Sequence, residues 1–323
     1  MLLEVKELTC SLRLAGQEVP IVDGVSFNLQ AGKCLALVGE SGCGKSMTAL
    51  SLLRLQPKVA HIVGGQVLLS GKNLLGYSVP QMYQVRGREM SMIFQEPMTS
   101  LNPVVRVGQQ VMEAVMLHEQ VSKKAARSRS IELFKRVKIP QPEQRFEAYP
   151  HQLSGGLKQR VMIAMALSTR PKVLLADEPT TALDVTIQAQ ILELLRELLQ
   201  DFQMAMLLIT HDLGVVNQIA DDIAVMYAGR IVEQAERRQL LTQPEHPYTR
   251  GLLGALPGRA APKAALSEIT GSVPSPAHWP SGCRFRPRCA EAMERCGHAF
   301  PELIQLGETR VACFARQTNQ EDR

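Results

Sequence analysis

The feature that most constrains this chain is the eight-residue run from Gly39 to Ser46, which reads GESGCGKS and fits the pattern G-x-x-x-x-G-K-[ST]. An apolar run at 34–38 precedes it, and a helix is predicted over about 45–55. Glycines let the backbone wrap closely around a phosphate, and the start of a helix adds positive potential. The run therefore predicts a phosphate-binding loop between a buried strand and a helix.

Each residue of this loop is a candidate contact to ATP, and two of them have distinct tasks. Lys45 is expected to reach the β- and γ-phosphates, and Ser46 is expected to hold Mg²⁺. The alternative is a glycine-rich turn without a ligand, which the complete pattern between strand and helix disfavours. The candidate ATP-binding residues are Gly39, Glu40, Ser41, Gly42, Cys43, Gly44, Lys45 and Ser46.

A second predicted strand at 173–176 ends in two carboxylates, Asp177 and Glu178. A strand of this kind delivers an aspartate to Mg²⁺ beside a phosphate loop. The adjacent glutamate could polarise a water molecule for attack on the γ-phosphate. A surface acidic pair is the alternative, and the apolar character of the strand argues against it.

Strands alternate with helices along much of the chain, which predicts an α/β fold with a parallel sheet. Residues 1–38 alternate apolar and polar with turns at Gly16, Gly24 and Gly32, and predict a small antiparallel sheet. Residues 62–95 resemble further strand. The remaining expectations are helices within 104–147, an amphipathic helix whose apolar face holds Ile187, Ile191, Leu194, Leu195 and Leu198, and a buried strand at 204–209.

The run at 153–160, LSGGLKQR, resembles the LSGG-x-x-QR signature of ABC ATPases. Other elements of that family follow in register. Gln95 in FQEP resembles the Q-loop, 182–184 the D-loop, and His211 in ITHD the switch histidine. Five motifs in order across residues 39–211 make the resemblance specific. It implies an ABC-type nucleoside triphosphatase core.

The resemblance also implies a mechanism in which two such domains hold two ATP molecules at their shared interface. Within one chain, the implied catalytic residues are Glu178, His211, Gln95 and Lys45, and the implied Mg²⁺ ligands are Ser46, Gln95 and Asp177. Ser154, Gly155 and Gly156 would contact the ATP held by the partner. One position departs from the family: where an aromatic residue usually stacks on adenine, the register gives Leu12.

Longer strings resemble the subgroup that powers dipeptide and oligopeptide importers, and related nickel importers share part of the pattern. They are FQEPMTSLNP, YPHQLSGG, ADEPTTALDVTIQAQI, VMYAGRIVE and HPYTRGLL. The resemblance implies a subunit that hydrolyses ATP to energise peptide uptake. Its partners would be a second ATPase subunit, of a different or the same sequence, two transmembrane permease subunits and an extracytoplasmic substrate-binding protein. Nickel or another small solute is the alternative cargo.

Composition limits the remaining classes. No apolar run reaches 18 residues, so no transmembrane helix is expected. The N-terminus lacks a secretory signal pattern. The net charge of +5 comes without a long basic block, so no nucleic-acid partner is expected. These features predict a protein that stays in the cytoplasm, and the resemblance to importer subunits implies a peripheral position on the cytoplasmic side of the inner membrane. A soluble ABC ATPase of translation or DNA repair is disfavoured, because each motif occurs once and no long heptad stretch is present.

The C-terminal part holds four cysteines behind a linker rich in Pro, Gly, Ala and Ser at 257–282. Little apolar periodicity is present there, so the tail is not expected to pack much core, and a metal centre could supply its stability. The spacing C-x₅-C-x₆-C-x₁₆-C does not favour zinc, which typically binds C-x₂₋₄-C pairs. Peptide-importer ATPases carry a similar tail that binds a [4Fe–4S] cluster. The resemblance therefore implies that cluster, with zinc and free thiols as alternatives, at Cys283, Cys289, Cys296 and Cys313.

These expectations divide the chain into an ATPase domain over 1–250, with a helical insertion over about 96–165, and a linker with a Cys-rich region over 251–323. Cys10, Cys34 and Cys43 lie outside the tail and are expected to be ordinary thiols.

Overall fold

The structure, a computed structural model, describes residues 1–14, 16–95, 100–181, 183–255 and 269–321. Parts of three expectations fall outside these residues: the start of the helical insertion at 96–99, position 182 of the D-loop, and linker residues 256–268. The chain divides into two compact units. The first unit comprises 1–2, 29–33 and 76–208, and the second comprises 3–28, 34–75 and 209–323.

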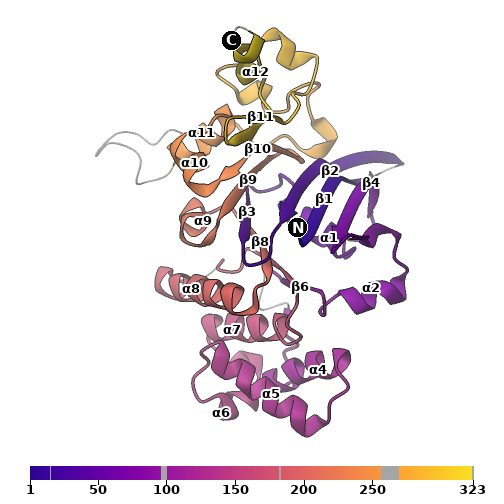
Figure 1. Cartoon of the computed structure of the whole chain (residues 1–323), viewed down its shortest axis with the longest axis vertical. Helices are drawn as coiled ribbons and strands as arrows, with labels where there is room; N and C mark the ends of the chain where they lie inside the picture. Colours follow the sequence, from indigo (N-terminus) through magenta and orange to yellow (C-terminus); the bar gives the residue numbers. More distant parts are fainter. Residues whose placement is uncertain (15, 96–99, 182, 256–268, 322–323) are drawn as a thin grey trace. The chain divides into compact units, whose positions relative to one another are not determined.

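The second unit contains the antiparallel sheet expected at the N-terminus. Its strands lie in the order β2-β1-β4-β5 (Figure 1). The β1–β4 register runs from Leu3 opposite Leu69 to Leu12 opposite Ala60. Gly24 was expected to lie in a turn, but it lies inside β2. It has a positive φ of 67°, which glycine adopts readily, and the strand continues through it. The bounds are β1 Leu3–Leu14, β2 Gln17–Leu29, β4 Ala60–Leu69 and β5 Lys72–Asn73.

A second group of strands in this unit surrounds β3, Cys34–Val38, whose five residues are all buried. β3 pairs in parallel with β9, Asp222–Tyr227, and β9 pairs with β10, Arg230–Glu236, in antiparallel fashion. Helix α1, Lys45–Leu52, begins where the sequence predicts and ends three residues earlier than expected. The other helices here are α9 Leu213–Ile219, α10 Arg237–Thr242 and α11 Pro247–Gly254.

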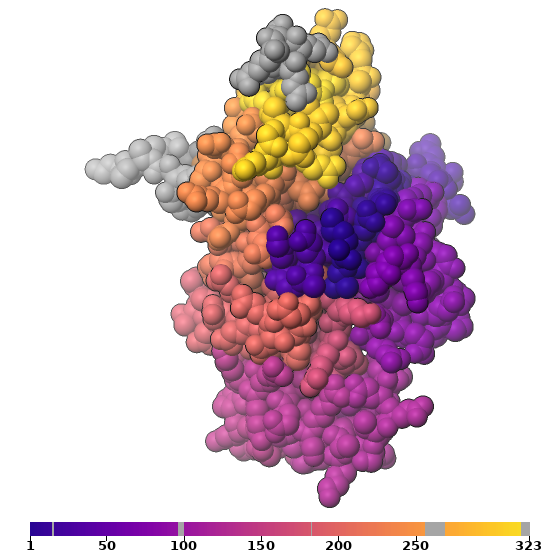
Figure 2. Space-filling view, viewed as in Figure 1, coloured from indigo at the N-terminus to yellow at the C-terminus, as the bar shows by residue number. Residues whose placement is uncertain are grey.

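The Cys-rich tail has more regular structure than its sequence predicts. It contributes β11, Ile304–Leu306, β12, Thr309–Val311, and α12, Phe314–Glu321. β12 pairs with β10 through Glu233 and Val311. The expectation that the tail packs little core was wrong, because Phe285, Val311 and Phe314 are buried. In Figure 2 the yellow surface of the tail adjoins the orange surface of the preceding β9–α11 segment.

The first unit contains the strand that ends in the acidic pair. β7, Val173–Asp177, pairs in parallel with β6, Met90–Ile93, and β8, Ala205–Thr210, is its other neighbour. All residues of β7 are buried. Helix α8, Val185–Phe202, buries four of the five residues of the predicted apolar face, whereas Ile187 is only partly buried; the four are Ile191, Leu194, Leu195 and Leu198. Asp184 caps its start by accepting a hydrogen bond from the Ile187 N–H at 2.9 Å.

Four helices of this unit lie together, as Figure 1 shows in magenta. They are α4 Val107–His118, α5 Lys123–Arg136, α6 Pro142–Phe146 and α7 Gly155–Ala166. The expectation of strand throughout 62–95 was wrong, since α2 occupies Val79–Val85. A capping box explains this helix: Gln81 accepts a hydrogen bond from the Ser78 N–H at 2.8 Å. Among the described residues, no helix combines the length and the apolar character needed to cross a membrane.

Candidate functional site

The predicted phosphate loop connects β3 to α1 in the second unit. Its lysine is almost fully buried, with 6% of Lys45 exposed. The ammonium group donates hydrogen bonds to the carbonyl oxygens of Gly39, at 2.7 Å, and Glu40, at 2.9 Å. The positive charge of Lys45 is therefore held against the first two residues of the loop.

Two glycines of the loop are required by close backbone contacts. A Cβ atom on Gly39 would lie 2.2 Å from the carbonyl oxygen of Met226 in β9, and one on Gly44 would lie 2.6 Å from that of Ile21 in β2. Both glycines also have positive φ angles, 155° and 106°. The motif glycines thus let the loop pack directly against two strands of the same unit.

Cys43 lies inside the loop and is 1% exposed. Burial raises the pKa of its thiol, and Lys45 opposes this effect. Sγ of Cys43 is 3.7 Å from Nζ of Lys45. A buried, protonated thiol fits the expectation of an ordinary cysteine.

Glu40 is held by residues that sequence reasoning did not single out. Its carboxylate accepts two hydrogen bonds from Arg288, and its N–H donates to the hydroxyl of Tyr248 at 2.9 Å. Arg288 lies in the Cys-rich tail and Tyr248 in α11. No local sequence signal links these residues, because more than 200 positions separate each from Glu40.

In the first unit, the predicted catalytic glutamate and Q-loop glutamine lie together. Nε2 of Gln95 donates a hydrogen bond to Oε2 of Glu178 at 3.2 Å. Thr181, which sequence reasoning missed, donates to the same oxygen at 2.9 Å. Asp177 is the buried last residue of β7. Glu178 has a positive φ of 46°, a strained conformation of the kind often found at functional sites.

The signature run LSGGLKQR forms the start of α7, with Ser154 at the N-cap. Ser154 and Gly155 are exposed, whereas Lys158, Gln159 and Arg160 are buried. Arg160 donates to the carbonyl oxygen of Val137 at 2.7 Å. The buried half of the run therefore fixes the helix, and its exposed start presents a hydroxyl and N–H groups to a ligand.

His211 follows β8 directly and is exposed. The adjacent Asp212 caps α9 by accepting from the N–H of Gly214 at 2.7 Å. His211 thus belongs to the same unit as the phosphate loop. The other unit holds Gln95, Asp177, Glu178 and the signature residues 154–156.

The tail cysteines lie in two turns and beside β12. The N–H of Cys283 donates to the carbonyl oxygen of Cys296 at 2.8 Å. Burial raises the pKa of Cys283 to about 11, and the nearby thiols of Cys296 and Cys289 add to the effect. Within the described part of the chain, no three His, Cys, Asp or Glu side chains converge as a metal ion requires.

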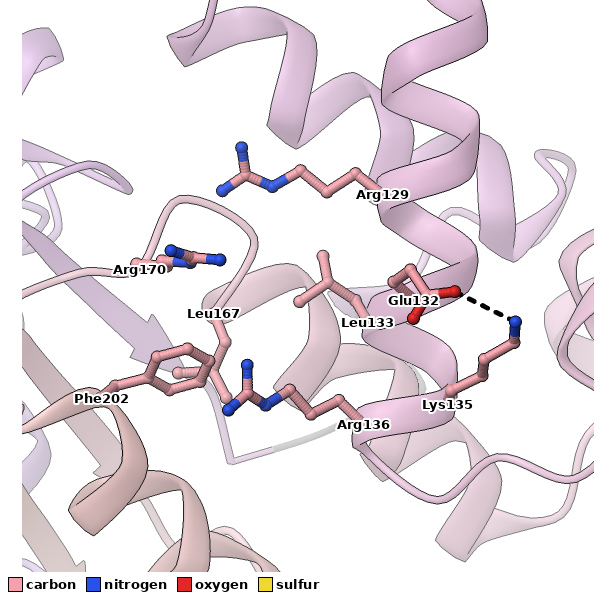
Figure 3. A pocket seen from close by; sticks show the side chains of 8 residues that line it. All are labelled: Arg129, Glu132, Leu133, Lys135, Arg136, Leu167, Arg170 and Phe202. Carbon is pink, nitrogen blue, oxygen red and sulfur yellow. Dashed lines mark hydrogen bonds and ion pairs between the residues drawn. The ribbon is translucent and has the colours of Figure 1, made fainter.

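A cavity of about 500 Å³ lies in the first unit between α5, α7 and α8. Figure 3 shows basic side chains around it, with an ion pair between Glu132 and Lys135 at 3.0 Å. Arg129 pairs with Glu119, and Arg136 pairs with Asp201 at 2.9 Å. None of the motif residues lines this cavity, and its charges are largely compensated within the protein.

Two family profiles match the chain. Residues 22–181 match the family described as "ABC transporter", and residues 232–296 match "Oligopeptide/dipeptide transporter, C-terminal region". The first match covers the phosphate loop and the acidic pair, and the second covers three of the four tail cysteines.

Curated relatives align over nearly the whole chain. The oligopeptide transport ATP-binding protein AppD of Bacillus subtilis is 50% identical, over 97% of this chain and 96% of that protein. The dipeptide transport ATP-binding protein DppD of the same organism is 46% identical, over 99% and 96%. The oligopeptide transport ATP-binding protein OppD of Salmonella typhimurium is 48% identical, over 97% and 93%.

Solved structures share the fold. The ATP-binding cassette MJ0796, a dimer in a post-hydrolysis state bound to ADP and Pi, has a TM-score of 0.66 at 24% identity, over 73% of this chain and 99% of that one. The protein cbiO1 of Clostridium perfringens, part of the ABC transporter complex cbiONQ, has a TM-score of 0.64 at 26% identity, over 75% and 91%. These matches confirm the predicted α/β class.

Proposed function

The chain belongs to the ATP-binding proteins of ABC transporters, and from that premise we propose that it hydrolyses ATP to drive uptake of dipeptides or oligopeptides. The observation that carries this proposal is the end-to-end likeness to three peptide transport ATP-binding proteins at 46–50% identity. The match to the oligopeptide/dipeptide C-terminal region also favours peptides over nickel or another small solute.

The proposed chemistry assigns Lys45 and the loop N–H groups to the phosphates, and Ser46 and Asp177 to Mg²⁺. Glu178 would polarise the attacking water molecule. Its hydrogen bonds from Gln95 and Thr181 support this role, because they help to orient the carboxylate. His211 would contact the γ-phosphate from the end of β8.

A second ATPase domain is part of this proposal. Ser154, Gly155 and Gly156 would contact an ATP molecule held by that partner, either a second copy or a different chain. The exposure of Ser154 and Gly155 supports this assignment, since a residue that acts on another subunit must be accessible. The N-terminal end of α7 is electrostatically suited to a phosphate.

We assign the permease contact to the surface of the first unit near Gln95. Phe94, which precedes Gln95 in the sequence, is 42% exposed, and two other large side chains of the same unit are exposed as well, Tyr83 at 60% and Val104 at 78%. Docking on two transmembrane permease subunits would bury them and hold the protein on the cytoplasmic side of the membrane. An extracytoplasmic binding protein would deliver the peptide.

For the Cys-rich tail we propose the [4Fe–4S] cluster. A single zinc ion draws four thiolates together around one centre, whereas a four-iron cluster binds each thiolate at a separate iron. The N–H of Cys283 donates to the carbonyl oxygen of Cys296 at 2.8 Å, and the match to the oligopeptide/dipeptide C-terminal region covers three of the four cysteines. These observations support a centre that the tail cysteines share. Such a cluster would cross-link the turns of the tail.

The substitution Glu178→Gln tests the function directly. In the purified transporter reconstituted in vesicles, we expect ATP binding to persist and hydrolysis to fall at least about 10²-fold, because the water molecule loses its polarising group. Peptide uptake should fall with it. Glu193→Gln, an exposed position on α8, is the matched control and should leave both rates unchanged. Near-normal hydrolysis by the Glu178 variant would show that another group is the base.

A further inference from the structure

Arg288 connects the Cys-rich tail to the phosphate loop. Its Nη1 and Nη2 atoms donate to the two carboxylate oxygens of Glu40, at 2.7 and 3.0 Å. This is the bidentate geometry that makes arginine–carboxylate pairs strong. The Arg288 side chain is 5% exposed and the Glu40 side chain 30%, so water reaches the pair mainly from the side of the carboxylate.

Backbone carbonyl groups fix the orientation of this guanidinium. Nε of Arg288 donates to the carbonyl oxygen of Thr270 at 2.9 Å. Nη2 also donates to those of Ile269, at 3.2 Å, and Gly271, at 3.1 Å. The planar group therefore presents one edge to Glu40 while its other N–H groups are occupied. A lysine ammonium could not satisfy the same set of acceptors.

The backbone on both sides of the Glu40 Cα atom is held as well. The Glu40 N–H donates to the Tyr248 hydroxyl, and the Glu40 carbonyl oxygen accepts from Lys45. Tyr248 packs edge-on against Tyr227, with ring centroids 4.6 Å apart, and both rings contact Phe285 of the tail. Three contacts thus define the position of the second residue of the loop.

We propose that Arg288 is a positioning residue for nucleotide binding, which makes the Cys-rich tail part of the nucleotide site. The inference rests on the proposed function, namely that the loop binds ATP. Glu40 places a carboxylate in a loop that must receive phosphates, and Arg288 neutralises it. By fixing the loop before the ligand arrives, Arg288 also reduces the conformational entropy lost on binding.

Attachment of the tail does not depend on this pair. Arg284 forms an ion pair with Asp23, donates to the carbonyl oxygen of Ala228 at 2.5 Å, and lies 3.6 Å above the Trp279 ring. β12 pairs with β10 in addition. Substitution of Arg288 should therefore leave the tail docked and change only the loop.

The test is a double-mutant cycle on the intact transporter, with the dissociation constant of MgATP and the melting temperature as readouts. Arg288→Ala should raise the dissociation constant about tenfold, the value of one charged hydrogen-bonded contact. Adding Glu40→Gln to Arg288→Ala should lower the constant again, because no unpaired carboxylate then opposes the phosphates. Arg286→Ala removes the same charge from the same turn and should match the wild type.

The outcomes separate this inference from the proposed function. Equal ATP affinity of the wild type and Lys45→Ala would overturn the proposed function itself. Loss of binding in Lys45→Ala together with equal constants for Arg288→Ala and Arg286→Ala would overturn only the role of Arg288. A double variant no better than Arg288→Ala would overturn its neutralising effect. Should the alanine variant fail to fold, Arg288→Lys replaces it; this variant keeps the charge but loses the set of hydrogen bonds, so unchanged affinity would overturn the positioning role.

Discussion

At the scale of single residues, the sequence predicts what local chemistry dictates. The glycines, Lys45 and Ser46 of the loop follow from the spacing of one short motif. Two further motifs supply Gln95 and Glu178, but neither predicts the hydrogen bond between these residues. Thr181 and Arg288 could not be found in this way. The side chain of each residue forms hydrogen bonds with a partner that the fold determines, and neither residue is part of a sequence motif that requires it.

A substitution at Gly44 tests the close approach of the loop to β2. Gly44→Ala should weaken MgATP binding and lower the melting temperature, since its Cβ would lie 2.6 Å from a backbone oxygen that cannot move alone. Gly71→Ala is the matched control: its φ of 81° carries a similar penalty of about 1 kcal/mol, but nothing lies within 4 Å. Calorimetry and nucleotide titration would compare them. Equal effects of the two variants would contradict the steric explanation.

At the scale of elements, the predictions that succeed are those with a strong periodic or apolar signal. β3, β7, β8 and the buried face of α8 lie where the pattern indicates. The helix α2 was missed because it has seven residues, too few for a period to appear, and depends on a capping box. The strands of the tail were missed because β11 and β12 have three residues each and form by pairing with a distant edge.

The start of α7 carries a prediction about action between subunits. Ser154→Arg should block hydrolysis of the ATP held by the partner, because its bulk fills the space at the helix start, while binding at the chain's own loop persists. Mixed complexes that contain one variant and one wild-type ATPase chain would separate the two sites. Gln144→Arg adds the same charge on an exposed face of α6 and should have no effect. Loss of the variant's own ATP affinity would contradict action in trans.

The start of α11 carries a prediction about pH. The buried His246 ring accepts a hydrogen bond from the Tyr248 N–H through Nδ1 at 3.0 Å, so the ring must be neutral. Burial, with Arg250 and Arg316 nearby, lowers its pKa to about 3. The native pKa lies below the usual 6.5, so the associated stability is complete above pH 6.5 and is lost as the pH falls toward 3.

Denaturant unfolding between pH 6.5 and 4 would measure this loss. The free energy of unfolding should decrease by up to about 1.4 kcal/mol per pH unit through His246 alone. His246→Asn offers a capping oxygen that does not titrate and is the matched control. The difference in unfolding free energy between wild type and variant should shrink as the pH falls. Parallel curves would show that the ring titrates normally.

At the scale of the whole molecule, sequence reasoning separated an ATPase domain from a Cys-rich tail, and these domain bounds remain a prediction. The contacts do not follow that separation. In the second unit, tail residues pair with β10, with Asp23 and with the phosphate loop. The contacts with Asp23 and with the phosphate loop join positions more than 200 residues apart, so no window of sequence reports them.

Loss of the proposed cluster should disorder the whole tail at once. Anaerobically purified protein should be brown, with iron and sulfide each near about four per chain. Cys289→Ser should bleach it, expose the tail to protease, and weaken MgATP binding as Arg288→Ala does, because Arg288 loses its place beside Glu40. Cys10→Ala should keep the colour. A measured content of about one zinc ion per chain and no sulfide would show that the tail binds zinc and not the cluster. A protein without any bound metal would contradict a metal centre.

The pairing of Glu40 with Arg288 also sets an order of events during biosynthesis. The two residues are 248 positions apart. At about 5–20 residues per second, the ribosome adds the guanidinium about 12–50 s after the carboxylate. Throughout that interval the nascent chain carries a phosphate loop with an uncompensated acid in it. A ribosome-stalled chain that ends before residue 288 should therefore bind MgATP at least about tenfold more weakly than the finished chain, so full affinity for the nucleotide appears only after that codon has been translated.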